Sequence, residues 1–259
     1  MRDTSSRREK IASMLRSTGS VQVPVLAERF GVSEVTIRND LKFLNDLGVS
    51  IRTYGGAILN EGNNRIVERA IEHKEQLYAR EKSAIGKVAA RYVEPGDAII
   101  LDSGSTTYQI ATHLADKDDV TVITNGLNVM NKLARFERLE LIMLGGTLRR
   151  KNMSFFGTHA ERSLRDLHVD KLFLGVDGIH MEKGITTHFE AEAQLNRLMR
   201  HAASTTIVVT DSSKFGRICL HQIMEVEHIS TVITDKGIGD EYRTRLEKSG
   251  IRVVVAEDE

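Results

Sequence analysis

Five short polar segments of this sequence carry groups that bind anions and hydroxyls, and each directly follows an apolar run. They are Asp102-Ser103-Gly104-Ser105-Thr106-Thr107, Thr124-Asn125-Gly126, Gly145-Gly146-Thr147, Asp177-Gly178 and Asp211-Ser212-Ser213-Lys214. The first is rich in hydroxyls and precedes a predicted helix, whose free N–H groups favour an anion. Well-capped turns between strands and helices use the same residue types. This segment alone therefore predicts an anion cradle and a capped turn equally well.

The elements that would position these segments alternate in type along the chain. Apolar, β-branched runs predict strands at 98–101, 120–124, 139–144, 171–176, 206–210, 231–234 and 251–255. Helical patterns lie between them, at 82–92, 106–115, 127–136, 159–167, 190–203 and 240–249. Such alternation predicts an α/β fold with a parallel sheet covered on both faces.

The carboxyl ends of parallel strands share one edge, where open α/β sheets bind ligands. Hydroxyls, glycines, carboxylates and one lysine gathered there suit a phosphorylated polyol or sugar. The predicted ligand-binding residues are Asp102, Ser103, Gly104, Ser105, Thr106, Thr107, Thr124, Asn125, Gly126, Gly145, Gly146, Asp177 and Lys214.

A different chemistry is indicated in the first sixty residues, within the segment LAERFGVSEVTIRNDLKFL. Ala27, Gly31 and Ile37 have the spacing of a helix-turn-helix, in which Ala packs at the helix crossing and Gly permits the turn. On a helical wheel Leu41 and Leu44 fall on the same face as Ile37 and predict its core stripe. Ser33 is the expected N-cap of this helix.

The opposite face of this helix carries residue types that read or hold DNA. The segment VSIRTYGGAI then alternates around Gly55-Gly56 and predicts a small β-wing. A helical hairpin with a solvated polar face is the alternative, but the wing and a basic excess agree with DNA binding. Asp40 is expected to be a helix-surface or intramolecular partner and not a contact to DNA bases. The predicted DNA contacts are Ser33, Val35, Thr36, Arg38, Asn39, Lys42 and Arg52.

Composition limits the remaining classes of function. The 259 residues are 41% apolar and 28% charged, which is ordinary for a globular protein. No apolar run approaches the roughly 20 residues of a membrane span, and no secretory signal precedes the first helix, so a cytoplasmic protein is expected. Residues 1–60 have a net charge of +3 and the remainder −3. This asymmetry favours a head that touches nucleic acid.

Metal and cofactor chemistry is not expected. The single cysteine, Cys219, excludes a disulfide framework, and the nine histidines form no H-E-x-x-H motif. G-x-G-x-x-G, P-loop and G-x-S-x-G motifs are also absent from the sequence. The expected organisation is a winged helix-turn-helix at 1–59, a linker at 60–80 that runs into a helix, and a sensing and oligomerising α/β domain at 81–259.

The segment VPVLAERFGVSEVTIRNDLKFLNDLGVSIRTYGGA resembles the signature of the DeoR family of bacterial sugar-operon regulators. In the family, two consecutive arginines usually precede the Asp of the recognition helix. This chain has Arg38-Asn39 before Asp40, which affects the operator sequence that it is expected to bind. The resemblance covers nearly the whole chain. It implies a body that shares its fold with ribose-5-phosphate isomerase, and a repressor that a sugar phosphate releases from operator DNA.

The resemblance also implies roles for individual residues. SGSTT is similar to the isomerase phosphate loop, Asp177 to its substrate-binding aspartate, and Lys214 to a site lysine typical of the family. Glu190, in a stretch that lies near the ligand in the family, is expected to hold sugar hydroxyls or an amine. The roles of Glu192, Arg149 and Arg150 stay open, as does the choice between a galactosamine-type and a glucitol-type effector.

The competing interpretation is an isomerase-like enzyme with a DNA-binding head. Isomerisation needs a carboxylate base and an acid partner. The isomerase pattern has a second acid three residues after its aspartate, where this chain has His180. We therefore expect binding without turnover and no catalytic residues. A homo-oligomer is expected, because one winged head offers little surface for selective DNA binding.

Overall fold

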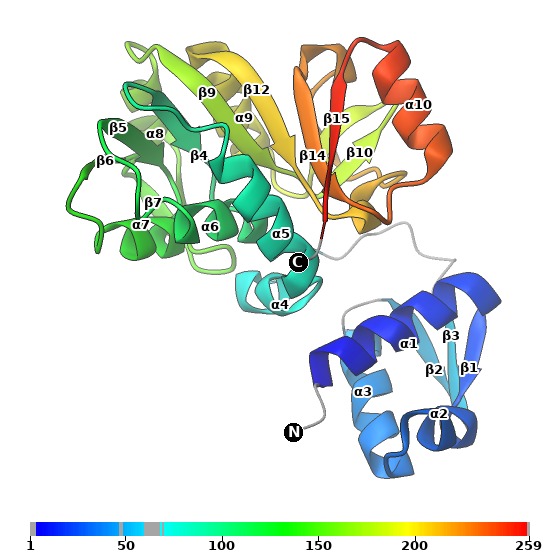
Figure 1. Ribbon diagram of the computed structural model, residues 1–259. Helices are drawn as coiled ribbons and strands as arrows, with labels where there is room; N and C mark the ends of the chain where they lie inside the picture. The colour runs from blue at the N-terminus through cyan, green and yellow to red at the C-terminus, as the bar shows by residue number, and fades with distance from the viewer. Residues whose placement is uncertain (1–3, 47–48, 60–67, 69, 258–259) are drawn as a thin grey trace. The chain divides into compact units, whose positions relative to one another are not determined.

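The protein is described here from a computed structural model, which describes residues 4–46, 49–59, 68 and 70–257. The chain divides into two compact units, at 1–69 and 70–259 (Figure 1). Each unit has its own apolar core.

The first unit is a winged helix-turn-helix, as the sequence predicts. Its elements are α1 (Thr4–Thr18), β1 (Ser20–Gln22), α2 (Val23–Phe30), α3 (Glu34–Asp46), β2 (Ser50–Thr53) and β3 (Gly56–Leu59). Gly31 ends α2 in the left-handed conformation, with a φ of 60°, which a tight turn between two helices requires. The predicted stripe of Ile37, Leu41 and Leu44 is fully buried.

An ion-pair cluster fastens α1 to α3 in this unit. Asp40 is buried and accepts hydrogen bonds from Arg7 Nε at 2.6 Å and Arg8 Nε at 2.8 Å. The Arg8 guanidinium also lies 3.9 Å from the ring centre of Phe43. Asp40 is thus an intramolecular partner. It holds α3 against α1 and leaves the opposite face of α3 exposed.

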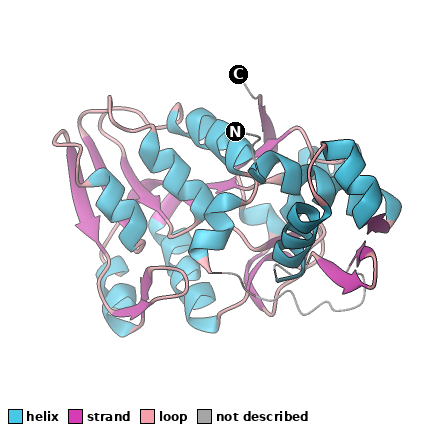
Figure 2. Ribbon diagram, turned by 90° about the horizontal axis from the view of Figure 1, so that it is seen from below, coloured by secondary structure: helices cyan, strands magenta, loops and turns pink. Residues whose placement is uncertain are grey.

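The second unit is an α/β domain in which helices alternate with strands (Figure 2). Its large sheet has seven strands, all parallel, in the order β15-β14-β12-β9-β4-β5-β6. Each of the seven predicted strands overlaps one of them. The strands are β4 (Ala98–Leu101), β5 (Val120–Thr124), β6 (Leu139–Met143), β9 (Val169–Gly175), β12 (Ala203–Val209), β14 (Thr231–Asp235) and β15 (Arg252–Ala256).

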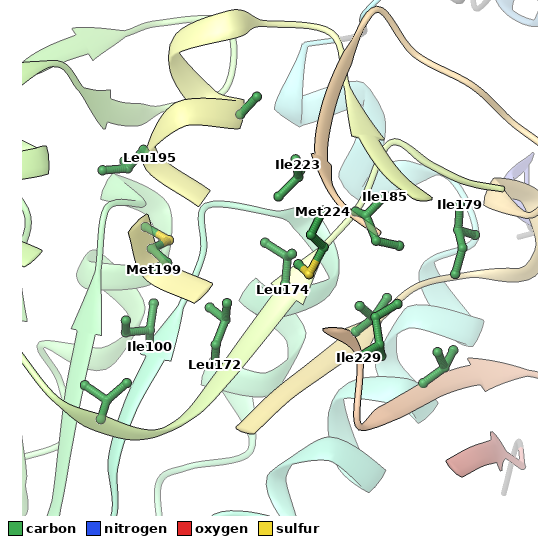
Figure 3. Packing of buried hydrophobic residues seen from close by; sticks show 14 of the residues in the cluster. Ile100, Leu172, Leu174, Ile179, Ile185, Leu195, Met199, Ile223, Met224 and Ile229 are labelled. Carbon is green, nitrogen blue, oxygen red and sulfur yellow. The ribbon is translucent and has the colours of Figure 1, made fainter. Parts of the chain in front are cut away.

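Two apolar cores cover the two faces of this sheet, which confirms the predicted layers. Successive strand residues alternate between the cores: Phe173 packs on one side. Leu172 and Leu174 pack on the other (Figure 3). The helices on the Phe173 side are α5 (Ala79–Ala90), α6 (Ser105–Thr112) and α7 (Leu127–Leu133). Those on the other side are α8 (Thr158–Leu164), α9 (Glu190–Ala202) and α10 (Asp240–Lys248).

Several short elements have no clear signal in the sequence. A hairpin joins β7 (Thr147–Arg149) to β8 (Ser154–Phe156), and a second sheet pairs β10 (Gly178–His180), β11 (Gly184–Thr187) and β13 (His221–Met224). Helix α4 (Ile71–Gln76) lies in the range predicted as a linker running into a helix. Two 3-10 turns, η1 (Ser212–Lys214) and η2 (Val226–His228), complete the unit.

Two further properties concern the described residues only. No helix among them has the length and apolar character to cross a membrane. Within the same part of the chain, no group of three or more His, Cys, Asp or Glu side chains is placed to hold a metal ion.

Candidate ligand site and nucleic-acid interface

The order of the large sheet creates a switch point between β4 and β9. The chain goes from β4 outward through β5 to β6, and then returns to β9 and continues in the other direction. The loops after β4 and β9 therefore diverge and leave a crevice at the carboxyl ends of the strands, where open α/β folds bind ligands. Asp102 follows β4 and Asp177 follows β9, so both carboxylates lie at this crevice.

The loop after β4 is built around Asp102, which is almost fully buried. Its Oδ1 accepts hydrogen bonds from the Gly104 N–H at 3.0 Å and the Thr107 hydroxyl at 2.7 Å. Burial raises the pKa of Asp102 to about 6, although those bonds, the Gly175 N–H and the charge of Lys74 lower it. A buried carboxylate with a raised pKa in a crevice is characteristic of functional sites.

Asp177 is buried as well, but it has cationic neighbours. Its Oδ1 accepts from Lys74 Nζ at 2.8 Å, and its Oδ2 accepts from the Thr187 hydroxyl at 3.1 Å. Burial opposes ionisation, but the charges of Lys74, Lys214 and His188 hold the pKa of Asp177 well below its usual range. Asp177 is therefore an ionised acceptor that a ligand hydroxyl can use.

The loop after β12 brings Lys214 to the same crevice. Asp211 caps the 3-10 turn η1 by accepting from the Ser213 N–H at 3.1 Å, and Asp235 accepts from the Ser212 N–H at 2.6 Å. Burial holds the pKa of Lys214 below its ordinary value, although the charges of Asp211 and Asp177 oppose this shift. The turn thus holds an ammonium among carboxylates at the edge of the sheet.

These loops enclose a cavity of about 40 Å³. Six of the residues predicted from the sequence line it: Asp102, Gly104, Ser105, Thr106, Asp177 and Lys214. Seven further lining residues were not predicted as ligand contacts: Lys74, Lys82, Gly175, Val176, Thr187, Glu192 and Asn196. Of these, only Glu192 was singled out in the sequence, with its role left open.

The other predicted residues of the crevice do not line the cavity, and several support its walls. Thr107 holds Asp102, and the Thr124 hydroxyl accepts from the Gly126 N–H at 3.0 Å. A Cβ on Gly126 would lie only 2.9 Å from Cα of Ser103, so glycine permits the two loops to touch. Asn125 donates to the Phe155 carbonyl at 3.1 Å.

The glycines after β6 serve the neighbouring hairpin. Gly146 has a φ of 128°, and a Cβ there would lie 2.5 Å from the Phe156 carbonyl oxygen. Gly145 lies beside it, and neither lines the cavity. Glu190 is exposed at the start of α9 and is also outside the cavity lining.

Two of the residues left open in the sequence contact each other between the β7–β8 hairpin and α9. Arg149 Nη1 lies 3.7 Å from Glu192 Oε2, and its guanidinium carbon lies 4.2 Å from the ring centre of Phe189. Asn152 donates to the same Glu192 oxygen at 3.1 Å. Arg150 is exposed. Glu192 therefore joins the hairpin to the cavity wall.

The lysines of the cavity that sequence reasoning missed come from distant helices. Lys74 lies on α4 and Lys82 on α5, where Lys82 Nζ donates to the Lys74 carbonyl oxygen. The site residues predicted from the sequence lie in polar segments that directly follow strands. Lys74 and Lys82 lie within helices and so do not fit this pattern. The only signal available is the run of charged residues around Lys74, which is also typical of an exposed helix.

The DNA-binding residues predicted on α3 lie on its outer face. Val35 is 67% exposed, and Arg38, Asn39 and Lys42 are exposed beside it. Arg38 forms an exposed i,i+4 ion pair with Glu34 at 2.9 Å, a type of pair that contributes little and is easily broken. This face therefore presents one apolar, one amide and two cationic side chains.

The N-terminus of α3 and the wing complete this surface. The Ser33 hydroxyl accepts from the Thr36 N–H at 3.2 Å, which makes Ser33 the N-cap predicted from the sequence. Arg52 is exposed on β2, and its N–H donates to Asn45 Oδ1 at 3.2 Å, which holds the wing against α3. Tyr54, at the tip of the wing, is fully exposed and was not among the predicted contacts.

A helix-turn-helix unit joined to an α/β unit with a polar cavity is the organisation of ligand-responsive DNA-binding regulators. Residues 7–63 match the family model described as the DeoR-like helix-turn-helix domain, and residues 78–236 match the DeoR C terminal sensor domain. The chain therefore belongs to the DeoR family of transcriptional regulators.

Curated relatives align over nearly the whole chain. A protein named as a candidate aga operon transcriptional repressor of Escherichia coli O157:H7 is 47% identical, over 97% of this chain and 94% of its own. The transcriptional repressor AccR of Agrobacterium fabrum is 34% identical, over 98% of both chains. The repressor GlcR of Bacillus subtilis is 32% identical, over 96% and 95%.

Among solved structures, a ribose-5-phosphate isomerase in complex with phospho-erythronic acid aligns with a TM-score of 0.39. The alignment covers 52% of each chain at 18% sequence identity.

Proposed function

We propose that this protein is a cytoplasmic repressor of a sugar or amino-sugar utilisation operon, and that a phosphorylated sugar binds in the crevice between β4 and β9. Binding of the sugar phosphate lowers the affinity for operator DNA. The observation that carries this proposal is the chemistry of the cavity: lysines, buried carboxylates and helix-start hydroxyls converge at the switch point of the sheet.

The components of a sugar phosphate find matching groups in this cavity. Ser105 and Thr106 lie in the first turn of α6, where hydroxyls and free N–H groups favour a phosphate. Lys214 adds a point charge for the same group. Asp102 and Asp177 are acceptors for sugar hydroxyls, and their burial makes them selective for a ligand that supplies donors.

The DNA-binding part of the proposal is supported by the exposed face of α3 and by the wing. Thr36, Arg38 and Asn39 are proposed to read the operator in the major groove, and Arg52 to dock the wing on the backbone or minor groove. The relatives that are named repressors support the direction of control.

A gel shift tests the proposal most directly. Full-length protein is titrated onto the DNA upstream of its own and neighbouring genes, with and without a panel of sugar phosphates. The panel contains galactosamine 6-phosphate, N-acetylgalactosamine 6-phosphate, glucitol 6-phosphate and the corresponding unphosphorylated sugars. At least one phosphorylated compound is expected to weaken the complex, and its unphosphorylated form is expected to have no effect. An operator complex that every compound leaves unchanged contradicts the proposal.

An isomerase-like enzyme is the alternative, but the chain lacks the second acid that the isomerase pattern has three residues after its aspartate. The position three residues after Asp177 is His180, which lies in β10 and pairs with Gly184 across the small sheet. We therefore propose that the ligand is bound and not converted. Turnover of any phosphorylated compound of the panel, followed by NMR, would favour the enzyme instead.

We also propose a homo-oligomer of at least two chains. One winged head presents a single recognition helix, whereas two heads on symmetric half-sites multiply the contact and its selectivity. Light scattering at micromolar concentration is expected to give at least the mass of a dimer. A monomer that still binds one half-site tightly would contradict this expectation.

A further inference from the structure

Helix α4 enters the candidate site through one side chain. Lys74 Nζ lies 2.8 Å from Asp177 Oδ1, and the two side chains are 15% and 8% exposed. The residues are separated by 103 positions in the sequence, so the contact is tertiary. The charge of Lys74 is also the largest opposite charge that acts on the pKa of Asp177.

Three hydrogen bonds hold the backbone and the other side of α4 in place. The Ile71 N–H donates to the Lys151 carbonyl at 2.8 Å, in the turn of the β7–β8 hairpin. Asn128 Nδ2 donates to Glu75 Oε1 at 3.1 Å, and Lys82 donates to the Lys74 carbonyl oxygen. The helix is therefore attached to the hairpin, to α7 and to α5 at once.

This arrangement leaves too little room for a sugar. The cavity measures about 40 Å³, whereas ligand pockets usually measure roughly 300 Å³ or more. Both carboxylate oxygens of Asp177 already have partners, Lys74 on Oδ1 and Thr187 on Oδ2. Each of these oxygens can accept a second hydrogen bond, but a cavity of this size has no space for a polyol beside Lys74, so a polyol that uses Asp177 competes with Lys74 for the same space.

We propose that Lys74 is an intramolecular competitor of the ligand for Asp177, and that helix α4 moves out of the crevice when a sugar phosphate binds. The inference rests on the proposed function of the same site. It adds the part of the chain that moves: α4 begins at Ile71, directly after the first residue of the second unit. Displacement of α4 can therefore be transmitted along the backbone to the DNA-binding unit.

Replacing Lys74 by Met tests the competition, because Met keeps the length of the side chain and removes its charge. Affinity of the full-length protein for the phosphorylated panel is measured by calorimetry. We expect the Lys74→Met protein to bind the active compound at least about fivefold more tightly than wild type. Lys248→Met, at the exposed end of α10, is the matched control and is expected to leave the affinity unchanged.

A second variant protects the test against loss of folding, because Lys74→Met leaves a buried carboxylate with one cation fewer. Glu75→Ala removes the hydrogen bond to Asn128 and leaves every charge of the cavity in place. It is also expected to raise ligand affinity. Hydrogen exchange is the independent measurement: the amides of α4 are expected to exchange faster when the ligand is bound.

The outcomes separate this inference from the proposed function. Weaker binding in both variants, with slower exchange in α4, would make α4 a clamp over the ligand and overturn the inference alone. If wild type binds no compound of the panel but Lys74→Met binds one, the competition is supported. The proposed release of operator DNA by a sugar phosphate is then contradicted. If neither protein binds any, both proposals fall.

Discussion

Asp102 offers a test of whether the crevice is kept for a ligand at a cost in stability. Its carboxyl is 4% exposed, and burial raises its pKa from 3.8 to about 6. Because the folded state holds this proton more tightly than the unfolded state, stability is highest below pH 4 and falls as the pH rises toward 6. Above about pH 6 the free energy of unfolding that Asp102 has lost no longer changes with pH.

The size of the loss follows from the two pKa values. A difference of about two pKa units corresponds to about 3 kcal/mol at pH 7.5, and to about 1 kcal/mol at pH 4.5, where the unfolded side chain is still partly protonated. Asparagine cannot ionise, and its amide oxygen can still accept from Gly104 and Thr107. We therefore expect Asp102→Asn to raise the free energy of unfolding by up to about 3 kcal/mol at pH 7.5 and by about 2 kcal/mol less at pH 4.5.

Urea denaturation followed by tyrosine fluorescence measures this difference. The chain has no tryptophan, and four of its five tyrosines belong to the second unit, so the signal reports mainly on that unit. Asp116→Asn, in an exposed turn, is the matched control and should change stability little at either pH. A less stable Asp102→Asn protein at pH 7.5, or an equal gain at both pH values, would refute the reasoning. A stabilised variant that also loses affinity for the sugar phosphate would identify Asp102 as a functional residue.

Three further predictions concern the site and the head. Lys214→Ala should bind operator normally and lose its response to the effector in the gel shift; a response at wild-type concentrations would place the phosphate site elsewhere. Asn39→Ala should weaken operator binding by about 1–3 kcal/mol and relax the preference at one base pair, measured by gel shifts on a set of single base-pair variants. Unchanged affinity and preference would remove Asn39 from the reading set. Asp40→Ala should destabilise the head by about 3–5 kcal/mol, because Arg7 and Arg8 lose their buried partner. Thermal unfolding followed by circular dichroism checks this, and a melting curve identical to that of wild type would contradict it.

Local patterns in the sequence predict the strands of the large sheet and the class of protein. Apolar β-branched runs have a local cause, so all seven strands of the large sheet were predicted, two of them with their observed bounds. The helix-turn-helix is similarly local, because Gly31 and the Ile37 stripe act within about twenty residues. The loops after parallel strands share one edge whatever the strand order, which explains why Asp102, Asp177 and Lys214 were found.

Which residues meet in the crevice depends on long-range contacts that no local pattern specifies. The order of the strands sets the switch point between β4 and β9, and so Gly145 and Gly146, after the edge strand β6, fall outside the cavity lining. The short strands β10, β11 and β13 carry too few residues for a periodic signal, and β13 pairs with β11 from a distant segment of the chain. Lys74 is the clearest case: a charged residue on a short helix has no local pattern that distinguishes an exposed face from a buried ion pair. Its contact with Asp177 exists because folding brings together two segments 103 residues apart, and only the folded chain supplies that proximity.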